Sequence, residues 1–564
     1  MSEPILLNGR WEHAAEEKTF QSVNPTTGEP LPYEFPVSPL DTVEAMIQAG
    51  AQAAVELRDT PLETRAAFLT DFADRIEANR EAIVTAAYTE TALSASPRLQ
   101  GELDRTVNQL RQAAWAVEDR SWVTATLDTA NNIRSMFGPL GGPVVVFGPN
   151  NFPLAFNGAS GGDFAAAIAS GNPVIAKANP SHAHTTRLLA QAALESIQAT
   201  GVPRATVQML YRTAPENGLR LVSHPAIGAT AFTGSKAGLN LKRAADAAGK
   251  PIYLELSSVN PVFVLPGALD ERLETIADAL YASCTLGAGQ FCTNPGLVFL
   301  LAGDIAEQFI EQARSRFDST EGGILLSEYG PESMAEAVQT WESAGASRIT
   351  GGARVPGERF RFQNTLYRVS AQTFMAHPSE LQTEAFGAAS LVIVADSEAE
   401  LVQAIASLEG NLTGSIYSHT GSADDALYDA IEPALRGKVG RLLNDKMPTG
   451  VTVSPAMNHG GPFPSTGHPG SRPWVFPASL HRFAALAPLL TTSARTAWPP
   501  ELQDRNPTGT MWRYIDRTWT QGDVWLSATQ SKRNERATTP NRIRTDPSKK
   551  TALTTCSSAL FERE

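Results

Sequence analysis

Apolar residues recur three and four positions apart along much of the first fifth of the chain. The segments 41–57, 64–90 and 103–117 show this spacing most clearly, and it is the spacing that gives a helix one apolar face. A short run with a strand-like pattern, within residues 131–142, then interrupts the helical rhythm. The pattern therefore predicts a helical region from residue 40 to about residue 118, followed by a strand.

Short apolar runs alternate with amphipathic segments in the next part of the chain. The apolar runs are 143–149, 172–178, 206–211, 229–234 and 251–257. Strands that alternate with helices predict a parallel sheet covered on both faces, and such sheets bind ligands at the carboxyl ends of their strands. We therefore interpret residues 1–256 as a dinucleotide-binding domain.

A second alternation of helix-like and strand-like segments follows without a long linker. It includes the helix-like segments 273–286 and 305–317 and the strand-like segments 296–303 and 389–397. This pattern predicts a second α/β domain over residues 257–446, packed closely against the first. The active-site cleft is expected between the two domains.

Composition and charge narrow the class of protein. Of the 564 residues, 42% are hydrophobic and 19% are charged, which is typical of a globular protein. The formal net charge of -13 argues against nucleic-acid and anionic-membrane partners. No apolar stretch reaches the ~20 residues that a membrane span needs, and the first residues do not resemble a signal peptide. We expect a cytoplasmic protein that acts on small molecules.

The chain has three cysteines, Cys284, Cys292 and Cys556. An odd number without metal-ligand spacing predicts neither a disulfide framework nor a metal site. Cys292 lies in GAGQFCTNPG, a glycine-rich loop after a helix-like segment, where a thiol can attack a substrate while a backbone N–H holds the developing oxyanion. On this motif alone, a cysteine that only fills space in the core stays an open alternative.

Two further polar residues lie where strands end. Glu255 closes the apolar run of YLELSSVNP, the position of a general base or of a salt-bridged strand end. Asn151 in FGPNNFPLAFN lies between a strand and the next helix, where its amide can donate to an oxyanion or cap the helix. Each alternative stays open for its motif taken alone.

A glycine-rich turn in AFTGSKAG joins a strand to a helix. Gly234, Ser235 and Gly238 are expected to present free backbone N–H groups and a helix N-terminus to a pyrophosphate. The motif is not GxGxxG, so a tight turn without a ligand is the alternative.

Taken together and in order, PNNFPL, VIAKANP, FTGS, LELSSVNP, GQFCTNPG and EAFG resemble the signature motifs of the aldehyde dehydrogenase superfamily, over roughly residues 1 to 465. The resemblance implies an aldehyde dehydrogenase-like α/β fold. That fold comprises a Rossmann-like cofactor domain, an α/β catalytic domain, and a small β oligomerisation element near residues 119–142 that residues 447–520 complete on their return to the cofactor domain. It also implies a homodimer or homotetramer.

The same resemblance implies a role for each matching residue. Cys292 is the nucleophile, Asn151 the oxyanion donor and Glu255 the base that activates water. His459, in AMNHGG, matches a histidine near the catalytic cysteine in NADP-preferring relatives and is either an auxiliary proton acceptor or a structural histidine. The implied cofactor contacts are Lys177, Gly234 and Ser235, with Glu384 on the nicotinamide ribose and Phe386 on the nicotinamide side.

The choice between NADP and NAD depends on the residues after Lys177. Many NAD-preferring relatives carry a glutamate three positions later, and this chain has Pro180 there. Because no carboxylate repels a 2′-phosphate at that position, we expect NADP, with NAD as the alternative. Arg212 either contacts the adenine or its phosphate or is a solvated surface arginine.

Within the superfamily, SSVNPVFVLPGAL and PTGVTVSPAMNHGGPFPS are similar to the 2,5-dioxovalerate (α-ketoglutarate semialdehyde) dehydrogenases. This similarity implies oxidation of 2,5-dioxovalerate to 2-oxoglutarate. The alternatives are a broad fatty or aromatic aldehyde dehydrogenase with an apolar tunnel and a catalytically silent binding or structural homologue. A CoA-acylating enzyme is disfavoured because such relatives commonly lack the glutamate found here as Glu255.

The carboxyl-terminal part departs from the pattern. Residues 471–475 and about 490–498 lose the resemblance, which we interpret as local reading-frame slips, and resequencing the coding DNA tests this. Residues 521–564 are polar, basic and without apolar periodicity, so we predict a disordered tail.

Overall fold

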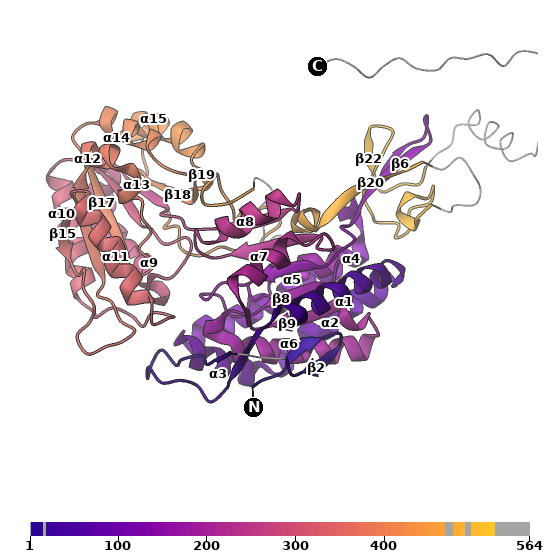
Figure 1. Cartoon of the computed structure of the whole chain (residues 1–564). Coiled ribbons are helices and arrows are strands. Elements are labelled where there is room, and N and C mark those ends of the chain that lie inside the picture. Colours follow the sequence, from indigo (N-terminus) through magenta and orange to yellow (C-terminus); the bar gives the residue numbers. More distant parts are fainter. Residues whose placement is uncertain (1, 15–17, 469–475, 477, 491–497, 525–564) are drawn as a thin grey trace, which may run out of the picture.

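Two seven-stranded sheets, each covered by helices, form the two lobes of the molecule (Figure 1). The computed structural model describes residues 2–14, 18–468, 476, 478–490 and 498–524. The departure at 471–475, most of that at about 490–498, Cys556 and the predicted tail from residue 525 onward lie outside the described residues. The predicted start of the disordered tail at residue 521 is wrong, because residues 521–524 are held by hydrogen bonds such as that from the N–H of Val524 to the carbonyl of Asp504 at 2.9 Å.

The first sheet has the strand order β12-β11-β7-β8-β9-β1-β2, in which β1 and β2 run antiparallel to their neighbours and the other five strands are parallel. The five apolar runs predicted as parallel strands are thus confirmed. Chain order moves from β7 through β8 to β9 and then returns to the other side of β7, so a crevice opens at the carboxyl ends of the strands. The strands are β1 Ile5–Leu7, β2 Arg10–Glu12, β7 Val144–Phe147, β8 Val174–Lys177, β9 Val207–Leu210, β11 Ala229–Thr233 and β12 Ile252–Glu255.

The helical region predicted over residues 40–118 is confirmed and packs against this sheet. All of α5 is buried, because it lies between the sheet and the layer of α2 and α4, and this explains why its sequence is apolar all round. Phe72 of α2 meets Phe164 of α5 edge-on at 5.6 Å between ring centroids. The helices are α1 Leu40–Asp59, α2 Leu62–Ala78, α3 Arg80–Thr91, α4 Gln100–Asp119, α5 Gly162–Ala169, α6 Ala183–Thr200, α7 Pro215–Ser223 and α8 Gly238–Ala247.

The second sheet confirms the second α/β section and has the order β15-β16-β17-β14-β13-β18-β19, parallel except for β15. Its core includes Phe263 and Phe299, which stack at 4.5 Å. The strands are β13 Pro261–Val264, β14 Leu297–Leu301, β15 Ser347–Thr350, β16 Thr365–Ser370, β17 Ala389–Ala395, β18 Asn411–Tyr417 and β19 Val439–Asn444. The helices are α9 Pro266–Thr285, α10 Asp304–Asp318, α11 Gly330–Ser343, α12 Ala371–Ala376, α13 Pro378–Leu381, α14 Glu398–Ala406 and α15 Asp425–Arg436.

A five-stranded sheet projects from the first lobe as an arm (Figure 1). Its strands come from the predicted 119–142 segment and from the carboxyl-terminal part: β5 Thr126–Asp128, β6 Ile133–Pro139, β20 Ala484–Leu490, β21 Arg513–Ile515 and β22 Thr518–Thr520. Ile133, Leu486 and Trp519 are exposed on it. The homodimer or homotetramer stays a prediction. A separate small sheet joins β3 Thr19–Phe20, β4 Phe35–Ser38 and β10 Arg212–Thr213.

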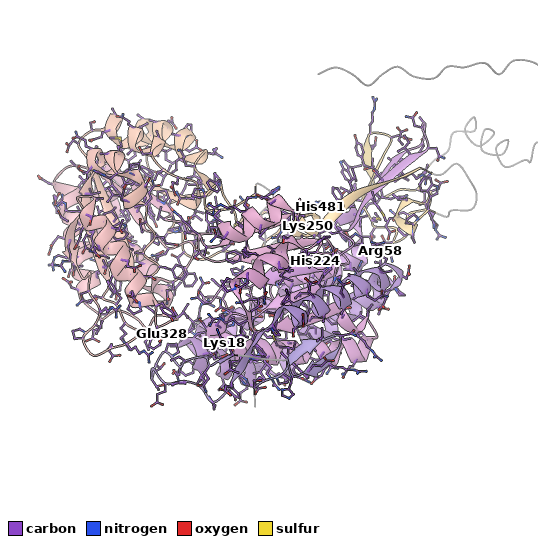
Figure 2. The ribbon with its side chains drawn as sticks, viewed as in Figure 1. Lys18, Arg58, His224, Lys250, Glu328 and His481 are labelled. Atoms are coloured by element: carbon purple, nitrogen blue, oxygen red, sulfur yellow. The ribbon has the colours of Figure 1, made fainter. Side chains whose placement is uncertain are left out.

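The chain crosses between the two lobes more than once, and these crossings hold the lobes together on either side of the candidate active site. After β19 it returns to the first sheet, where Leu256 donates from its N–H to the carbonyl of Ser465 at 2.8 Å. Glu328 of the second lobe lies on the side that faces the first lobe (Figure 2), and Arg359, its ion-pair partner, donates to the carbonyl of Gly28 at 2.9 Å. No helix in the described part of the chain is long and apolar enough to span a membrane.

Candidate active site

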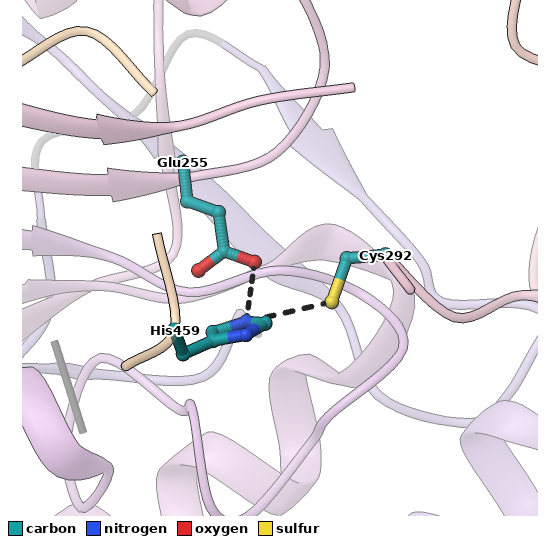
Figure 3. Close-up of side chains that lie close together, drawn as sticks. All are labelled: Glu255, Cys292 and His459. Carbon is teal, nitrogen blue, oxygen red and sulfur yellow. Dashed lines mark hydrogen bonds and ion pairs between the residues drawn. The ribbon is translucent and has the colours of Figure 1, made fainter. Parts of the chain in front are cut away.

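Three side chains from distant parts of the chain meet between the lobes (Figure 3). Glu255 ends β12, Cys292 follows the helical turn Leu286–Gly289, and His459 lies on the segment that returns from β19. His459 Nε2 is 2.9 Å from Glu255 Oε1 and 3.6 Å from Cys292 Sγ. The structure therefore brings together the nucleophile, base and auxiliary histidine that the sequence predicted.

The loop that carries Cys292 is held in place by backbone geometry. Gly289 has a φ of +75°, and a Cβ there would overlap the backbone of Gly387, so only glycine allows this close approach. Asn260 Nδ2 donates to the carbonyls of Cys292 and Asn294, both at 2.9 Å. Asn260 lies in the motif LELSSVNP, but the sequence predicted no role for it. Its hydrogen-bond partners lie more than 30 positions away along the chain, so no local pattern points to them.

The environment of Cys292 keeps its thiol protonated in the resting site. Burial and the nearby Glu255 carboxylate raise the pKa of this thiol well above its usual value. The attacking form therefore needs a proton acceptor within reach. Cys284 differs: its Sγ lies 3.0 Å from the Ser390 hydroxyl in a closed core, and burial raises its pKa to about 12.

A single nitrogen of His459 faces both of its neighbours. When Nε2 carries a proton, it donates to Glu255 and cannot accept from the thiol. When Nε2 is unprotonated, it accepts from the thiol, and the short contact with Glu255 then requires the proton on the carboxyl group. Both groups are buried, with Glu255 6% and His459 2% exposed, so bulk water does not readily exchange these protons. His459 Nε2 can therefore exchange a proton with either neighbour, one at a time.

Asn151 lies at the site, although one N–H of its side-chain amide already donates a hydrogen bond. Its Nδ2 donates to the carbonyl of Gln290 at 2.9 Å, two residues before Cys292, and its own carbonyl accepts from Arg98 at 2.9 Å. The amide has two N–H groups, so one remains for an oxyanion near the thiol. The predicted role as oxyanion donor stays a prediction.

Lys177 and Arg212 form a cationic corner at the carboxyl ends of the strands. Burial and the neighbouring Arg212 charge both lower the pKa of Lys177, to about 8. A half-buried ammonium next to a second cation favours an anionic ligand, so the corner fits a nucleotide phosphate. Pro180 begins a 3-10 turn just beyond it. Arg212 itself is exposed, and both interpretations of it stay open.

The turn after β11 corrects one sequence expectation. The N–H of Gly234 donates to the Glu255 carbonyl and that of Gly238 to the Ser235 carbonyl, both at 3.0 Å, so the prediction that these two groups are free is wrong. Both glycines instead pack against Phe232, which a Cβ at either position would crowd. Their contact with a cofactor, and that of Ser235, stays a prediction.

Glu384 and Phe386 line a small cavity beside the cysteine loop, together with Phe291 and Asn294. The N–H of Ser258 donates to Glu384 Oε1 at 3.4 Å, and burial raises the pKa of Glu384. Their predicted contacts with the nicotinamide ribose and ring stay predictions. The structure places both residues next to the loop that carries the thiol.

The same three central groups have the chemistry of a metal site. The ligand atoms of Glu255, Cys292 and His459 all lie within 4.8 Å of one another. Local cysteine spacing did not predict this, because each group comes from a different part of the chain. Their mixed donors suit a soft divalent ion such as zinc.

Several residues for which the sequence predicted no role lie near the thiol, and the charge of one of them, Arg105, interacts with that of Cys292. Arg98 pairs with Glu102 at 2.5 Å. Arg105 lies one helical turn after Glu102, on the same face of α4. The signal available in the sequence was the spacing of these three residues on α4 and just before it, which places them on one face. Phe152 and Phe156 pack with Phe291 in a separate apolar cluster at this point.

Comparisons with known proteins agree over most of the chain. Residues 11–440 match the model of the aldehyde dehydrogenase family. Alpha-ketoglutaric semialdehyde dehydrogenase 2 of Azospirillum brasilense is 37% identical over 519 residues, covering 89% of this chain and 97% of the relative. Alpha-ketoglutaric semialdehyde dehydrogenase of Acinetobacter baylyi is 34% identical, covering 89% and 96%.

Solved structures confirm the fold. PnpE in complex with nicotinamide adenine dinucleotide has a TM-score of 0.74 at 21% identity, covering 89% of this chain and 100% of that chain. The NAD+ complex of an aldehyde dehydrogenase from Bacillus cereus has a TM-score of 0.73 at 21% identity, covering 87% and 96%. The family model and the two relatives above 30% identity establish the assignment that the motifs implied. The chain belongs to the aldehyde dehydrogenase family.

Proposed function

We propose that this aldehyde dehydrogenase oxidises 2,5-dioxovalerate to 2-oxoglutarate, with NADP as the preferred nicotinamide dinucleotide. The substrate is supported by the names of the two relatives that are 37% and 34% identical over nearly their whole length. NADP is supported by the half-buried cation Lys177 next to Arg212 and by Pro180 at the position where many NAD-preferring relatives carry a carboxylate.

The observation that carries the chemistry is the contact of one histidine nitrogen with both the thiol and the carboxylate. The Cys292 thiol passes its proton to His459 and attacks the aldehyde carbon, which gives a thiohemiacetal oxyanion. The remaining N–H of Asn151 donates to that oxyanion. When bound, the nicotinamide dinucleotide supplies the acceptor for the hydride that leaves this carbon. Cys292 then holds the substrate as a thioester.

Hydrolysis of the thioester needs an activated water. The ionised carboxylate of Glu255 is the base for this step, and its second oxygen, Oε2, has no hydrogen-bond partner in the described part of the chain. That oxygen takes a proton from water, which attacks the thioester carbonyl and releases the acid and the Cys292 thiolate. The product leaves with two carboxylates, the proton on His459 returns to the Cys292 thiolate, and the proton taken up by Glu255 leaves to solvent before the next turnover.

Parallel assays test this assignment. We expect 2,5-dioxovalerate to reduce NADP with a higher kcat/KM than NAD, and to exceed a long-chain aldehyde and benzaldehyde. The second candidate is a broad fatty or aromatic aldehyde dehydrogenase, which the apolar cluster of Phe152, Phe156 and Phe291 favours. A higher kcat/KM for either neutral aldehyde would replace the proposed substrate by that class.

His459→Asn is expected to slow the first turnover roughly 10-fold to 100-fold near neutral pH, because the thiol loses its proton acceptor. The pKa of Cys292 lies above its usual range, so the deficit should shrink as the pH rises and the thiol ionises unaided. Rapid mixing across about pH 6 to pH 10 measures this, and alkylation of Cys292 by iodoacetamide should follow the same profile. A deficit that is the same at every pH would contradict proton transfer to His459.

NADP affinity is expected to fall as the pH rises through the pKa of Lys177, which is about 8. Below that pH the ammonium attracts the 2′-phosphate, and above it Lys177 is neutral and must take up a proton to bind the phosphate in the same way. From pH 7 to about pH 9.5 we expect a rise of up to roughly 30-fold in the Kd for NADP and a much smaller rise for NAD.

Fluorescence titration of both nucleotides measures this difference. Lys177→Met should remove it, whereas Lys446→Gln, a change at an exposed lysine of the second lobe, should preserve it. Equal pH dependence for NADP and NAD in the unmodified protein would contradict the role of Lys177.

A further inference from the structure

Arg105 lies beside the apolar approach to the reactive thiol. Its guanidinium is 4.8 Å above the ring of Phe156 and 5.9 Å from that of Phe152. The Phe156 ring is in turn 6.4 Å from the ring of His459, whose Nε2 lies 3.6 Å from Cys292 Sγ. A continuous row of contacts therefore leads from this cation to the nucleophile.

One edge of the Arg105 guanidinium has no partner. Nη1 donates to the carbonyl of Val451 at 3.3 Å, whereas Nε and Nη2 are buried and form no hydrogen bond within the described part of the chain. Nε and Nη2 form the side of the guanidinium that presents two parallel N–H groups. Leaving both groups unsatisfied in a buried place is costly, so a ligand with two adjacent acceptors fits this edge.

The neighbouring arginine shows why this edge is unusual. Arg98 also contacts Phe152, at 4.4 Å, but it pairs with Glu102 at 2.5 Å and donates to the Asn151 carbonyl at 2.9 Å. The other oxygen of Glu102 accepts from the N–H groups of Leu154 and Ala155. The charge of Glu102 acts on Arg105, but among the described residues no carboxylate lies within ion-pair distance of the Arg105 guanidinium.

A second cation approaches the thiol from the other lobe. Arg441 of β19 donates to the carbonyls of Pro448 and Gly450 at 3.1 and 3.2 Å, on the same strand-free segment whose Val451 carbonyl binds Arg105. The charges of both arginines act on Cys292. Two cations therefore act on the thiol together with the carboxylates of Glu255 and Glu384. The apolar rings beside Arg105 complete surroundings that suit a short aldehyde with a carboxylate.

We propose that the Nε and Nη2 edge of Arg105 binds the substrate carboxylate in a bidentate manner and so selects aldehydes with a terminal carboxylate. The proposal rests on the function proposed above and deepens it, because it names the group that recognises the acidic end of the substrate. Phe152 and Phe156 contact the carbon chain, and the aldehyde points toward Cys292. Arg105 is thus a specificity residue that takes no part in bond breaking.

The test compares 2,5-dioxovalerate with pentanal, a neutral aldehyde with the same number of carbons. In Arg105→Gln, the ratio of kcat/KM for the acidic aldehyde to that for pentanal should fall roughly 100-fold, mainly through the KM of the acidic aldehyde. Arg105→Lys keeps the charge but loses the pair of parallel N–H groups. Its kcat/KM ratio should therefore lie between those of the unmodified protein and of Arg105→Gln. Arg111→Gln is the matched control, since Arg111 lies on the same helix and is solvent-exposed, and should keep the original ratio.

Calorimetry with 2-oxoglutarate gives a second measurement that does not depend on turnover, and binding should weaken in Arg105→Gln but not in Arg111→Gln. An unchanged substrate ratio and unchanged 2-oxoglutarate binding in Arg105→Gln would overturn the assignment of Arg105 while leaving the proposed function intact. An unmodified protein that prefers pentanal would instead overturn the proposed function itself, and the carboxylate site with it.

Discussion

Replacing Cys292 by alanine is expected to lower kcat by roughly 10⁴-fold or more, because no thioester can form without the thiol. Of the two described cysteines, Cys292 is the one beside an imidazole, with its Sγ 3.6 Å from His459 Nε2. Nicotinamide absorbance with 2,5-dioxovalerate and NADP measures the loss. Nucleotide binding should be retained, which shows that the variant is folded.

Cys284→Ala is the matched control for this change. Its thiol is enclosed in the core of the second lobe, with a pKa of about 12, and it should keep its activity at a small cost in stability. Turnover that survives Cys292→Ala, or that disappears only in Cys284→Ala, would contradict the role of Cys292.

Glu255→Gln is expected to separate the two halves of the reaction. The amide keeps the shape of the carboxylate and still contacts His459, but it cannot take a proton from water. The first turnover should therefore release about one reduced nucleotide per site in a rapid burst. Steady turnover should then be roughly 10²-fold to 10⁴-fold slower than in the unmodified protein.

Rapid mixing followed at the nicotinamide absorbance band resolves the burst from the steady rate. Glu311→Gln, an isosteric change at an exposed glutamate on α10 that pairs with Arg314, should behave like the unmodified protein. A Glu255→Gln variant with normal steady turnover would contradict water activation by Glu255. A variant without any burst would instead assign Glu255 to the first half of the reaction.

The strands and helices were predictable because their signals are local. The run PVVVFGP is apolar at every position of β7, as expected of a strand buried on both faces, and the spacing in α4 marks its buried side. The approximate location of Glu255 at a strand end and Cys292 in a glycine-rich loop followed from the same signals. Their closeness followed from the resemblance to the family, not from spacing.

The hydrogen bonds of the site were not predictable in the same way. The motif AFTGSKAG predicted a free backbone N–H at Gly234. In the structure this N–H donates to the carbonyl of Glu255 on the neighbouring strand. Asn151 similarly donates to Gln290, 139 positions away. Arg98 and Arg105 have comparable sequence surroundings, and only the fold shows that the first is paired while the second keeps one edge open.

The most direct measurement is the mass of the covalent intermediate. Glu255→Gln, mixed with 2,5-dioxovalerate and NADP and quenched in acid, should carry one 2-oxoglutaryl group as a thioester on the peptide that contains Cys292. Omission of NADP should prevent its formation, since the acyl group arises only after hydride transfer. No adduct after a burst of reduced nucleotide, or an adduct on Cys284 instead, would contradict thioester catalysis by Cys292.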